Sequence, residues 1–508
     1  MSRSTTRRTA VIAAVAASTI FGATLATQLP ALAAPAKGNQ IHNVIYLLGD
    51  GMGRTHVTAG RERFYGADGK LNMEKFPVVG QVATHAVEKG SNLPALVTDS
   101  ASSATAWSSG VKTYNNALGV DSYGKRVSTL MEQAHAADLR TGNVSTAEVT
   151  DATPAGMYSH ALLRGCQGPV YSASSCVPKG DAAPADQTLV TPIAEQIATN
   201  GVADVILGGG LGRFEPADAK TLTAQGYSVL GSFGDPALGT DNGAQTAASQ
   251  RVATRGELGA VNADKVIGLF NRGNMTVETS KAAAAEGAAV KNEPSLPEMT
   301  AKAIRLLNTK KNTKGFLLQI EGALIDKRSH ANDAAQTLGE IKAFDDAVKV
   351  ARDFAAKDGH TLVIVTADHE CAGFNIIEKG SFANAEAKTP PGNVDSGNPA
   401  NNGTPLRTAS GALDPTRSTG IQNGEGLTGT SPAGNFAPAT FRTADDAASV
   451  VDGSPEASLW RTYLSGNHTG ADVPLFAFGP GAIALAGSYQ NTALFGIMQR
   501  SLGLPSTK

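Results

Sequence analysis

The stretch GFLLQIEGALIDKRSH, residues 315–330, joins an apolar run to a dense group of ionisable side chains. The run is apolar at nearly consecutive positions, which is typical of a strand covered on both faces in a parallel sheet. Glu321, Asp326, Lys327 and His330 follow it closely. Charges that follow a strand are more commonly solvated loop residues than metal ligands, so this stretch alone predicts the strand and leaves the role of its charges open.

Other apolar runs along the chain have the same character. Each is short and is bounded by glycine or polar residues: NVIYLLGD (43–50), TGNVSTAEV (141–149), ADVILGGG (203–210), TLVIVTADH (361–369) and VPLFAFGPG (473–481). Helical patterns lie between them. This alternation indicates an α/β layered fold with a largely parallel sheet, built as one large domain.

The clearest helical pattern covers residues 337–359. Leu338, Ile341 and Phe344 recur on one face, which we expect to pack on the sheet. The charged residues of the segment, Asp345 included, fall off this apolar stripe. We therefore expect these charges to form a solvated face.

Composition limits the classes of protein that the chain can belong to. Lys and Arg total 43 against 45 Asp and Glu, a formal charge of -2, so no general basic field predicts a nucleic-acid surface or binding to an anionic membrane. A small anionic substrate remains compatible, because local charge is enough to bind it. The 56 glycines exceed the usual share of about 7% and predict many tight turns.

The first 33 residues have the pattern of an export signal. Basic residues precede the apolar stretch AVIAAVAASTIFGATLA, and small residues follow at Ala31 and Ala33, so we expect cleavage after Ala33. A retained membrane anchor is the alternative, and no later segment is apolar enough to span a bilayer. The pair Arg7-Arg8 leaves the twin-arginine and general export routes both open. The mature protein would be secreted, either extracellular or in the cell envelope.

Two cysteines agree with export. Cys166 and Cys176 flank a short loop of the kind that a disulfide can close, and Cys371 is left over. Residues 380–440 show no periodicity and are rich in Gly, Pro, Asn and Thr, which predicts a long surface excursion within the domain 34–508.

Acidic residues lie at the ends of four different predicted strands: Asp50, Asp151, Glu321 and Asp368. Ligands in open α/β sheets bind beyond the carboxyl ends of the strands. Any one of these acids is commonly a turn or cap residue. Four together, each beside further ligand-type residues, indicate a site.

Two aspartates have histidines close by in the sequence, in arrangements that suit metal ligands. Asp368 and His369 are adjacent, and Asp326 and His330 are four residues apart, which places both on one face of a helical turn. His468 lies in a turn before the last predicted strand, where a lone histidine is more often inert than functional.

Ser100 is a candidate nucleophile. Asp99 and Ser100 open a small-residue stretch with helical character, which places Ser100 at a helix N-terminus, where the dipole favours an anion. An ordinary Asp/Ser cap is the alternative. No Gly-x-Ser-x-Gly elbow or His-based triad activates the serine, so a nearby metal would have to do so.

These motifs, taken in order from LLGDGMG through VTDSASSATAWSSGVKTYN, GNVSTAEVTDATPA, DVILGGG, IEGA, IDK, TADH and HTG, closely resemble the bacterial branch of the alkaline phosphatase family. The resemblance runs from about Asn43 to Pro480. It implies a three-layer α/β/α sandwich with a large, mostly parallel central sheet and long loop insertions. It also implies two Zn2+ ions, one Mg2+ ion and a phosphoserine intermediate in the hydrolysis of small-molecule phosphate monoesters, and it leaves a homodimer open.

The resemblance also assigns roles residue by residue. One zinc would be held by Asp326, His330 and His468, and the other by Asp50, Asp368 and His369, with Ser100 beside it. The magnesium would be held by Asp50, Thr153 and Glu321, with Asp151 holding its waters. Arg164 would bind two phosphate oxygens, and Lys327 would reach phosphate through water. Arg328 and Ser329 are expected to be solvated bystanders.

Two positions depart from the family pattern. Cys371 stands where many members carry a further histidine, which puts the tuning of the nearby zinc in doubt. Asn116 replaces a common glycine, whereas the Cys166 and Cys176 spacing matches a family disulfide.

Two other functions are alternatives to the hydrolysis of phosphate monoesters. A sulfatase or phosphodiesterase on this scaffold is the nearer one, but the Cys/Ser-x-Pro-x-Arg signature of sulfatases is missing at Ser100. The other is a phosphate-binding protein without turnover, and the presence of Ser100 and Arg164 disfavours it.

Overall fold

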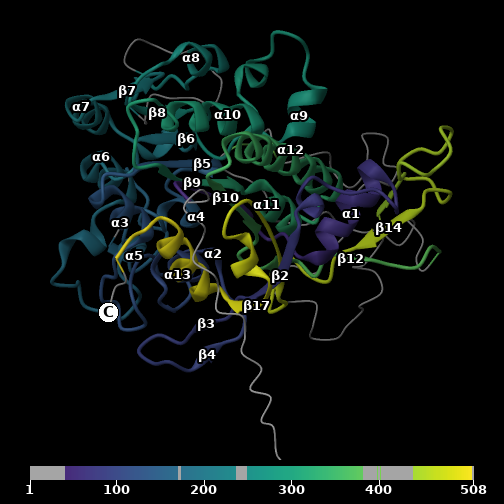
Figure 1. Cartoon of the computed structure of the whole chain (residues 1–508), viewed down its shortest axis with the longest axis horizontal. Helices are drawn as coiled ribbons and strands as arrows, with labels where there is room; N and C mark the ends of the chain where they lie inside the picture. The colour runs from purple at the N-terminus through teal and green to yellow at the C-terminus, as the bar shows by residue number, and fades with distance from the viewer. Residues whose placement is uncertain are drawn as a thin grey trace, which may run out of the picture.

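A ten-stranded sheet forms the centre of the computed structural model, which describes residues 41–169, 173–235, 249–380, 398, 401 and 439–505 (Figure 1). Its strand order is β17-β2-β16-β10-β1-β9-β5-β6-β8-β7. The strands are β1 Asn43–Gly49, β2 Val78–Ala83, β5 Arg140–Glu148, β6 Val205–Gly209, β7 Tyr227–Leu230, β8 Lys265–Leu269, β9 Phe316–Gly322, β10 Thr361–Thr366, β16 Val473–Phe478 and β17 Gly487–Gln490.

All six apolar runs form strands of this sheet, namely β1, β5, β6, β9, β10 and β16. Every residue of β1, β6, β9 and β10 is buried, as expected for strands covered on both faces. The pairs from β10 to β7 are parallel, and only β16 runs antiparallel to its neighbours β10 and β2. The predicted large, mostly parallel sheet is therefore confirmed.

Helices cover both faces of the sheet. Figure 1 shows α10 and α12 on one side of β5, β9 and β10, and α2, α4 and α13 on the other, so the fold has three α/β/α layers. The helices are α1 Arg54–Tyr65, α2 Ser100–Ser109, α3 Leu130–Ala136, α4 Ala152–Ala155, α5 Ala173–Cys176, α6 Ile193–Asn200, α7 Pro216–Ala224, α8 Arg255–Ala260, α9 Glu278–Ala283, α10 Leu296–Leu307, α11 Leu324–His330, α12 Ala334–Asp358 and α13 Asn491–Ser501. Short strands complete the fold: β3 Ala86–Val87, β4 Pro94–Ala95, β11 Glu370–Cys371, β12 Asn375–Ile376, β13 Ala439–Phe441, β14 Leu459–Thr462 and β15 His468–Thr469.

Helix α12 confirms the predicted apolar stripe and corrects the predicted solvated face. Leu338, Ile341 and Phe344 are buried, but so is Asp345. Its carboxylate accepts hydrogen bonds from the Asn72 backbone N–H and side-chain amide and from the Met73 N–H. A buried carboxylate is stable when such donors satisfy it. These donors come from a segment far away in the sequence, so local periodicity could not predict them.

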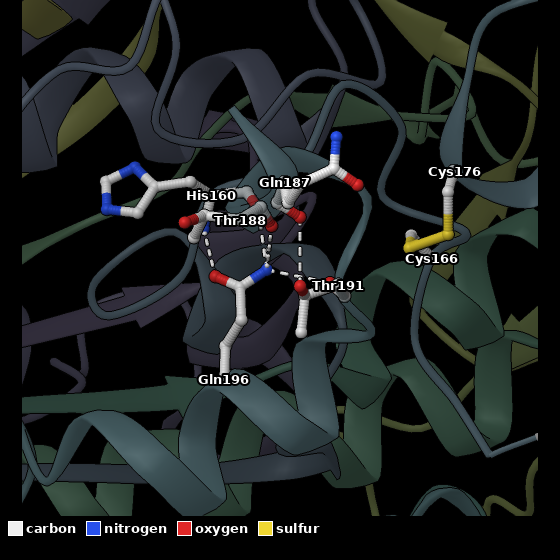
Figure 2. The surroundings of a disulfide bond; sticks show 7 residues. All are labelled: His160, Cys166, Cys176, Gln187, Thr188, Thr191 and Gln196. Atoms are coloured by element: carbon white, nitrogen blue, oxygen red, sulfur yellow. Dashed lines mark hydrogen bonds between the residues drawn. A yellow bond between two sulfur atoms is a disulfide. The ribbon is translucent and has the colours of Figure 1, made fainter. Parts of the chain in front are cut away.

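The predicted disulfide between Cys166 and Cys176 is present (Figure 2). Beside it, Gln196 of α6 ties three segments together, because its side-chain amide donates to the carbonyls of His160, Thr188 and Thr191 and its oxygen accepts from the His160 N–H. These bonds hold the backbone of His160, four residues before Arg164, against α6.

The predicted export signal, residues 1–33, and most of the predicted excursion, residues 381–397, 399–400 and 402–438, lie outside the described residues. Within the excursion, Asn398 donates to the carbonyl of Asn274, and Asn401 donates to the carbonyl of Met275. Among the described helices, none combines the length and apolar character that crossing a bilayer requires.

Glu132 of α3 makes the fold sensitive to acid. Burial alone would raise the pKa of this carboxyl, but hydrogen bonds from His160, from the Thr129 N–H and from Arg126 lower it to about 2. A carboxyl with a depressed pKa stabilises the fold above its unfolded pKa, and the stabilisation is lost as the pH falls through the folded pKa. The favourable charge of Glu132 therefore acts above about pH 4.5 and disappears near pH 2.

We expect Glu132→Gln to lower the free energy of unfolding of the metal-stripped protein by about 2–3 kcal/mol near pH 7. The difference from wild type should shrink as the pH falls from about 4.5 to 2. Urea unfolding at several pH values measures it, with the exposed Glu456→Gln as control. A difference that does not change with pH would show that the carboxylate charge has no part in this stabilisation.

Candidate metal centre

The carboxyl ends of four adjacent strands, β10, β1, β9 and β5, meet at one edge of the sheet. Leu48 pairs with both Glu321 and Thr366, and Ser145 pairs with Glu321. Asp50 follows two residues after Leu48, and Asp368 two residues after Thr366. The shared register therefore brings the predicted strand-end acids together, as expected for this class of sheet.

A first cluster of ligand atoms contains Asp50, Asp368 and His369, whose atoms lie within 4.8 Å of one another. The His369 Nε2 atom lies 3.1 Å from Asp368 Oδ2, 3.6 Å from Asp50 Oδ1 and 3.2 Å from Ser100 Oγ. One ring nitrogen carries at most one proton, so it cannot satisfy three oxygens at once. A cation among these atoms would.

A second cluster contains Asp326, His330, Cys371 and His468, again within 4.8 Å of one another. One turn of α11 places His330 Nε2 3.2 Å from Asp326 Oδ2, as predicted from the spacing of four. His468 lies on β15 rather than in a turn, and its Nε2 is 3.7 Å from Asp326 Oδ1 and 3.0 Å from His330 Nε2.

Backbone carbonyls fix the orientation of both rings in the second cluster. His330 Nδ1 lies 2.6 Å from the Gly466 oxygen, and His468 Nδ1 lies 3.0 Å from the Thr98 oxygen. A carbonyl only accepts, so each Nδ1 must carry the proton, and in the neutral rings both Nε2 atoms turn lone pairs toward each other. In metal-binding histidines, the ring nitrogen that does not bind the metal typically donates to a backbone carbonyl in this way.

The residues predicted for the magnesium site offer oxygen atoms as ligands. Glu321 accepts a hydrogen bond from Ser145 Oγ, and the Thr153 backbone oxygen accepts one from Gln319. Asp151 caps α4 by accepting from the Ala152 N–H. Carboxylate and hydroxyl oxygens are ligands that suit Mg2+.

Two cations share the carboxylate of Asp151. Arg164 donates to Asp151 Oδ1 at 2.7 Å, and Lys327 Nζ donates to Asp151 Oδ2 at 2.7 Å. Burial opposes the charge of Asp151, but these cations hold its pKa well below the usual range. Arg164 also donates to Asp99 Oδ2 at 3.3 Å, so two carboxylates fix its guanidinium.

Ser100 opens α2, as predicted, and Asp99 caps this helix by accepting from the Ser102 N–H. The same carboxylate accepts from the Asn116 N–H, and the Asn116 carbonyl accepts from the Arg164 N–H. Asn116 has φ 74°, a left-handed conformation that asparagine tolerates better than most residues. Through these two hydrogen bonds, Asn116 links the N-terminus of α2, where Ser100 lies, to the backbone of Arg164.

The residues present fit a group of bound cations. Several buried oxygens receive no hydrogen bond from any described residue: Asp50 Oδ1, Thr153 Oγ1, Asp326 Oδ1 and Asp368 Oδ2. Burial, followed by the charge of Asp368, raises the pKa of Asp50 well above the usual range, and burial raises that of Glu321 to about 8. Orphaned oxygens and mutually repelling carboxylates in one buried place are the conditions that metal ions relieve.

The structure corrects the prediction for two residues of α11. Arg328 and Ser329 are buried, not solvated. Arg328 donates to the Asn401 carbonyl, and Ser329 donates to the Ile325 carbonyl at 2.8 Å. Asn401 lies 73 residues away in the sequence, so the local run of charges does not reveal the contact that buries Arg328.

Sequence reasoning also underrated two residues of the site. Asp99 was recognised as a helix cap, but not as a carboxylate that holds Arg164. Cys371 is predicted only as a departure from a family pattern, whereas the structure makes it a member of the second cluster. Its position two residues after His369 in TADHEC is the sequence signal for it.

Comparisons with known proteins agree with this geometry. A family model described as alkaline phosphatase matches residues 41–504. The alkaline phosphatase of Escherichia coli (strain K12) is 43% identical over 346 residues, which cover 64% of this chain and 69% of that protein. Alkaline phosphatase 3 of Bacillus subtilis (strain 168) is 32% identical over 477 residues, 90% of this chain and 88% of that protein.

A solved structure is similar in fold as well. The alkaline phosphatase of the Antarctic bacterium TAB5 superposes with a TM-score of 0.59 at 25% identity, covering 92% of this chain and 99% of that one. These matches confirm the family resemblance and the fold class that were inferred from the motifs.

Proposed function

The chain belongs to the alkaline phosphatase family and is a phosphatase, and we propose that it releases phosphate from monoesters through a phosphoserine on Ser100, in a centre of two zinc ions and one magnesium ion. The observation that carries this proposal is the position of Ser100. Ser100 lies in the first turn of α2, and its hydroxyl oxygen is 3.2 Å from Nε2 of His369. His369 belongs to one of the two clusters of potential metal ligands.

Zinc ligands in this proposal are those of the two clusters: Asp50, Asp368 and His369 in one, and Asp326, His330 and His468 in the other. When bound, the ions would supply Lewis-acid stabilisation of the phosphoryl oxygens and make deprotonation of the serine hydroxyl easier. Asp50, Thr153 and Glu321 would hold magnesium.

The chain's own residues bind and orient the substrate in this mechanism. The Ser100 oxygen attacks the phosphorus, its bond to phosphorus forms as the bond to the leaving alcohol breaks, and a water then releases phosphate and restores the serine. Arg164 donates N–H groups to two phosphoryl oxygens, and its ion pairs with Asp99 and Asp151 prevent it from swinging away. Lys327, fixed on Asp151, adds positive charge near the phosphate.

A direct test is release of phosphate from a simple aryl monoester by the purified protein, supplied with zinc and magnesium, from neutral to alkaline pH. The matching aryl diester and aryl sulfate are the comparison substrates. Preference for the monoester supports the proposal. Preference for the diester or the sulfate would favour the rival activities on this scaffold, and phosphate binding without turnover of any ester would favour a binding protein.

The third site should select magnesium. Its proposed ligands are oxygens only, and Asp151 with its two cations leaves a polar, charged surrounding that suits a hydrated ion. We expect metal analysis of the purified protein to give about two zinc ions per magnesium ion. A fully active protein with three zinc ions and no magnesium would overturn this assignment.

Location outside the cytoplasm belongs to the same proposal. The disulfide between Cys166 and Cys176 supports it, because such bonds persist mainly in oxidising compartments. In this view residues 1–33 are removed on export and residues 34–508 form the catalytic domain. N-terminal sequencing of the mature protein would test the cleavage after Ala33.

A further inference from the structure

The short ladder between β11 and β15 sorts its side chains onto two faces. Glu370 pairs with Thr469, and Cys371 pairs with His468. Residues directly opposite in an antiparallel pair share a face, and successive residues alternate between faces. Thr469 Oγ1 donates to Glu370 Oε2, which identifies the first face. Cys371 and His468 therefore project together on the other.

On that face the Cys371 sulfur lies among ligand atoms. It is within 4.8 Å of one ligand atom each from Asp326, His330 and His468. Both Cys371 and Asp326 are buried, and Asp326 Oδ1 receives no hydrogen bond from any described residue. The sulfur thus lies near two imidazole nitrogens and a buried carboxylate, one of whose oxygens receives no hydrogen bond from the described residues.

Gly51 keeps the sulfur in this position. Its carbonyl accepts from the Cys371 N–H at 3.0 Å. A Cβ at residue 51 would come within 2.7 Å of Cys371 Cβ and 2.8 Å of Asp326 Oδ1, and the residue has φ +68°. Only glycine fits both the space and the backbone conformation, so the loop of Asp50 closes directly over the cysteine and the aspartate.

We propose that Cys371 is a fourth protein ligand, as a thiolate, of the metal ion held by Asp326, His330 and His468. This inference rests on the metal centre in the proposed function. On binding, the S–H bond breaks, its proton passes to solvent, and the sulfur lone pair forms the bond to the metal, with no change of oxidation state. A set of one thiolate, two imidazoles and one carboxylate selects zinc over magnesium at this position.

The alternative is that the thiol only packs there. Cys371 Sγ lies 3.8 Å from the Asp326 backbone oxygen, a distance that a thiol donating a weak hydrogen bond would also satisfy. The two cases differ in one property, the presence of a sulfur–metal bond, so the experiment must detect that bond and not the rate of the enzyme.

Cobalt titration of the chelator-stripped wild-type protein detects it, because a thiolate bound to Co2+ gives a charge-transfer band in the near ultraviolet. Cys166 and Cys176 form a disulfide, so of the chain's three cysteines Cys371 alone is a free thiol. We expect the band to rise with bound cobalt and to be missing in Cys371→Ser. In Cys371→Ser we also expect the affinity of this site for zinc to fall by at least roughly 100-fold. This loss would exceed the one caused by removing a residue that only hydrogen-bonds to a metal ligand.

Thr469→Val is the matched control. It removes the hydrogen bond on the opposite face of the same ladder and leaves the ligand face intact, so it should keep the band. Wild-type protein that binds two cobalt ions without the band would overturn the thiolate ligand and leave the metal centre standing. Wild-type protein that binds no cobalt would overturn both. The wild-type spectrum decides between these results even if Cys371→Ser does not fold.

Discussion

We expect the replacement of Ser100 with alanine to lower kcat for an aryl phosphate monoester by about a thousandfold or more, on the order of the losses that follow removal of a covalent nucleophile. Alanine has no oxygen to form the phosphoserine, so the variant must rely on direct attack by water. The remaining ligands and Arg164 are unchanged, and we expect substrate binding to fall much less than kcat. Initial rates at saturating substrate, with zinc and magnesium supplied, give this comparison.

Ser108→Ala provides the control, because Ser108 is a second buried serine of α2 whose hydroxyl only donates a long bond of 3.5 Å to the Thr105 carbonyl. It should keep the wild-type rate. Mass spectrometry of acid-quenched wild-type enzyme should find phosphate on the peptide that contains Ser100, and Ser100→Ala should carry none there. A Ser100→Ala rate close to that of Ser108→Ala would refute the phosphoserine mechanism.

The central strands could be predicted from the sequence because burial restricts which residues a strand can contain. Strands such as β1 and β9 are covered on both faces, so their residues must be apolar nearly throughout. The strands missed by the pattern, β2, β7, β8 and β17, lie toward the two margins of the sheet. All four residues of β17 and most of β2 are partly or fully exposed, so no continuous apolar run marks them.

The site could be predicted in part for a different reason. Asp50 and Asp368 lie just past the ends of strands and Ser100 begins a helix, and these positions are local properties. Contacts between residues far apart in the sequence could not be predicted. They include the hydrogen bonds that the buried Asp345 accepts, the bond from Arg328 to a backbone carbonyl, and the pairing of Cys371 with His468 about a hundred residues later. No pattern of spacing encodes which distant backbone will meet a given side chain.

Two neighbouring carboxylates keep the guanidinium group of Arg164 charged. Burial disfavours the ionised guanidinium, but Asp151 and Asp99 more than compensate and hold its pKa above the usual value. Two of the five N–H groups of Arg164 donate to these carboxylates, at 2.7 Å to Asp151 and at 3.3 Å to Asp99. The group is therefore charged and oriented in advance, which would reduce the entropy cost of binding a phosphoryl group in the proposed mechanism.

Arg164→Ala should distinguish monoesters from diesters. If one non-bridging oxygen of the substrate faces the metal-type ligands, a monoester has two others for the guanidinium, whereas a diester has one. We expect kcat/KM for the aryl monoester to fall by about 100- to 1,000-fold, as when a donor aimed at developing charge is lost. The loss for the diester should be much smaller.

Arg164→Lys and Arg251→Ala complete the experiment. Lysine keeps the charge but lacks the planar pair of donors, so it should recover only part of the lost monoester rate. Arg251 is an arginine that pairs with Glu257 at 2.7 Å outside the site, and its replacement should change neither rate. Equal losses for the two esters in Arg164→Ala would mean that the guanidinium acts through general charge alone. The preference for monoesters would then have to come from the metal ligands or from Lys327, the other described cation that donates to the Asp151 carboxylate.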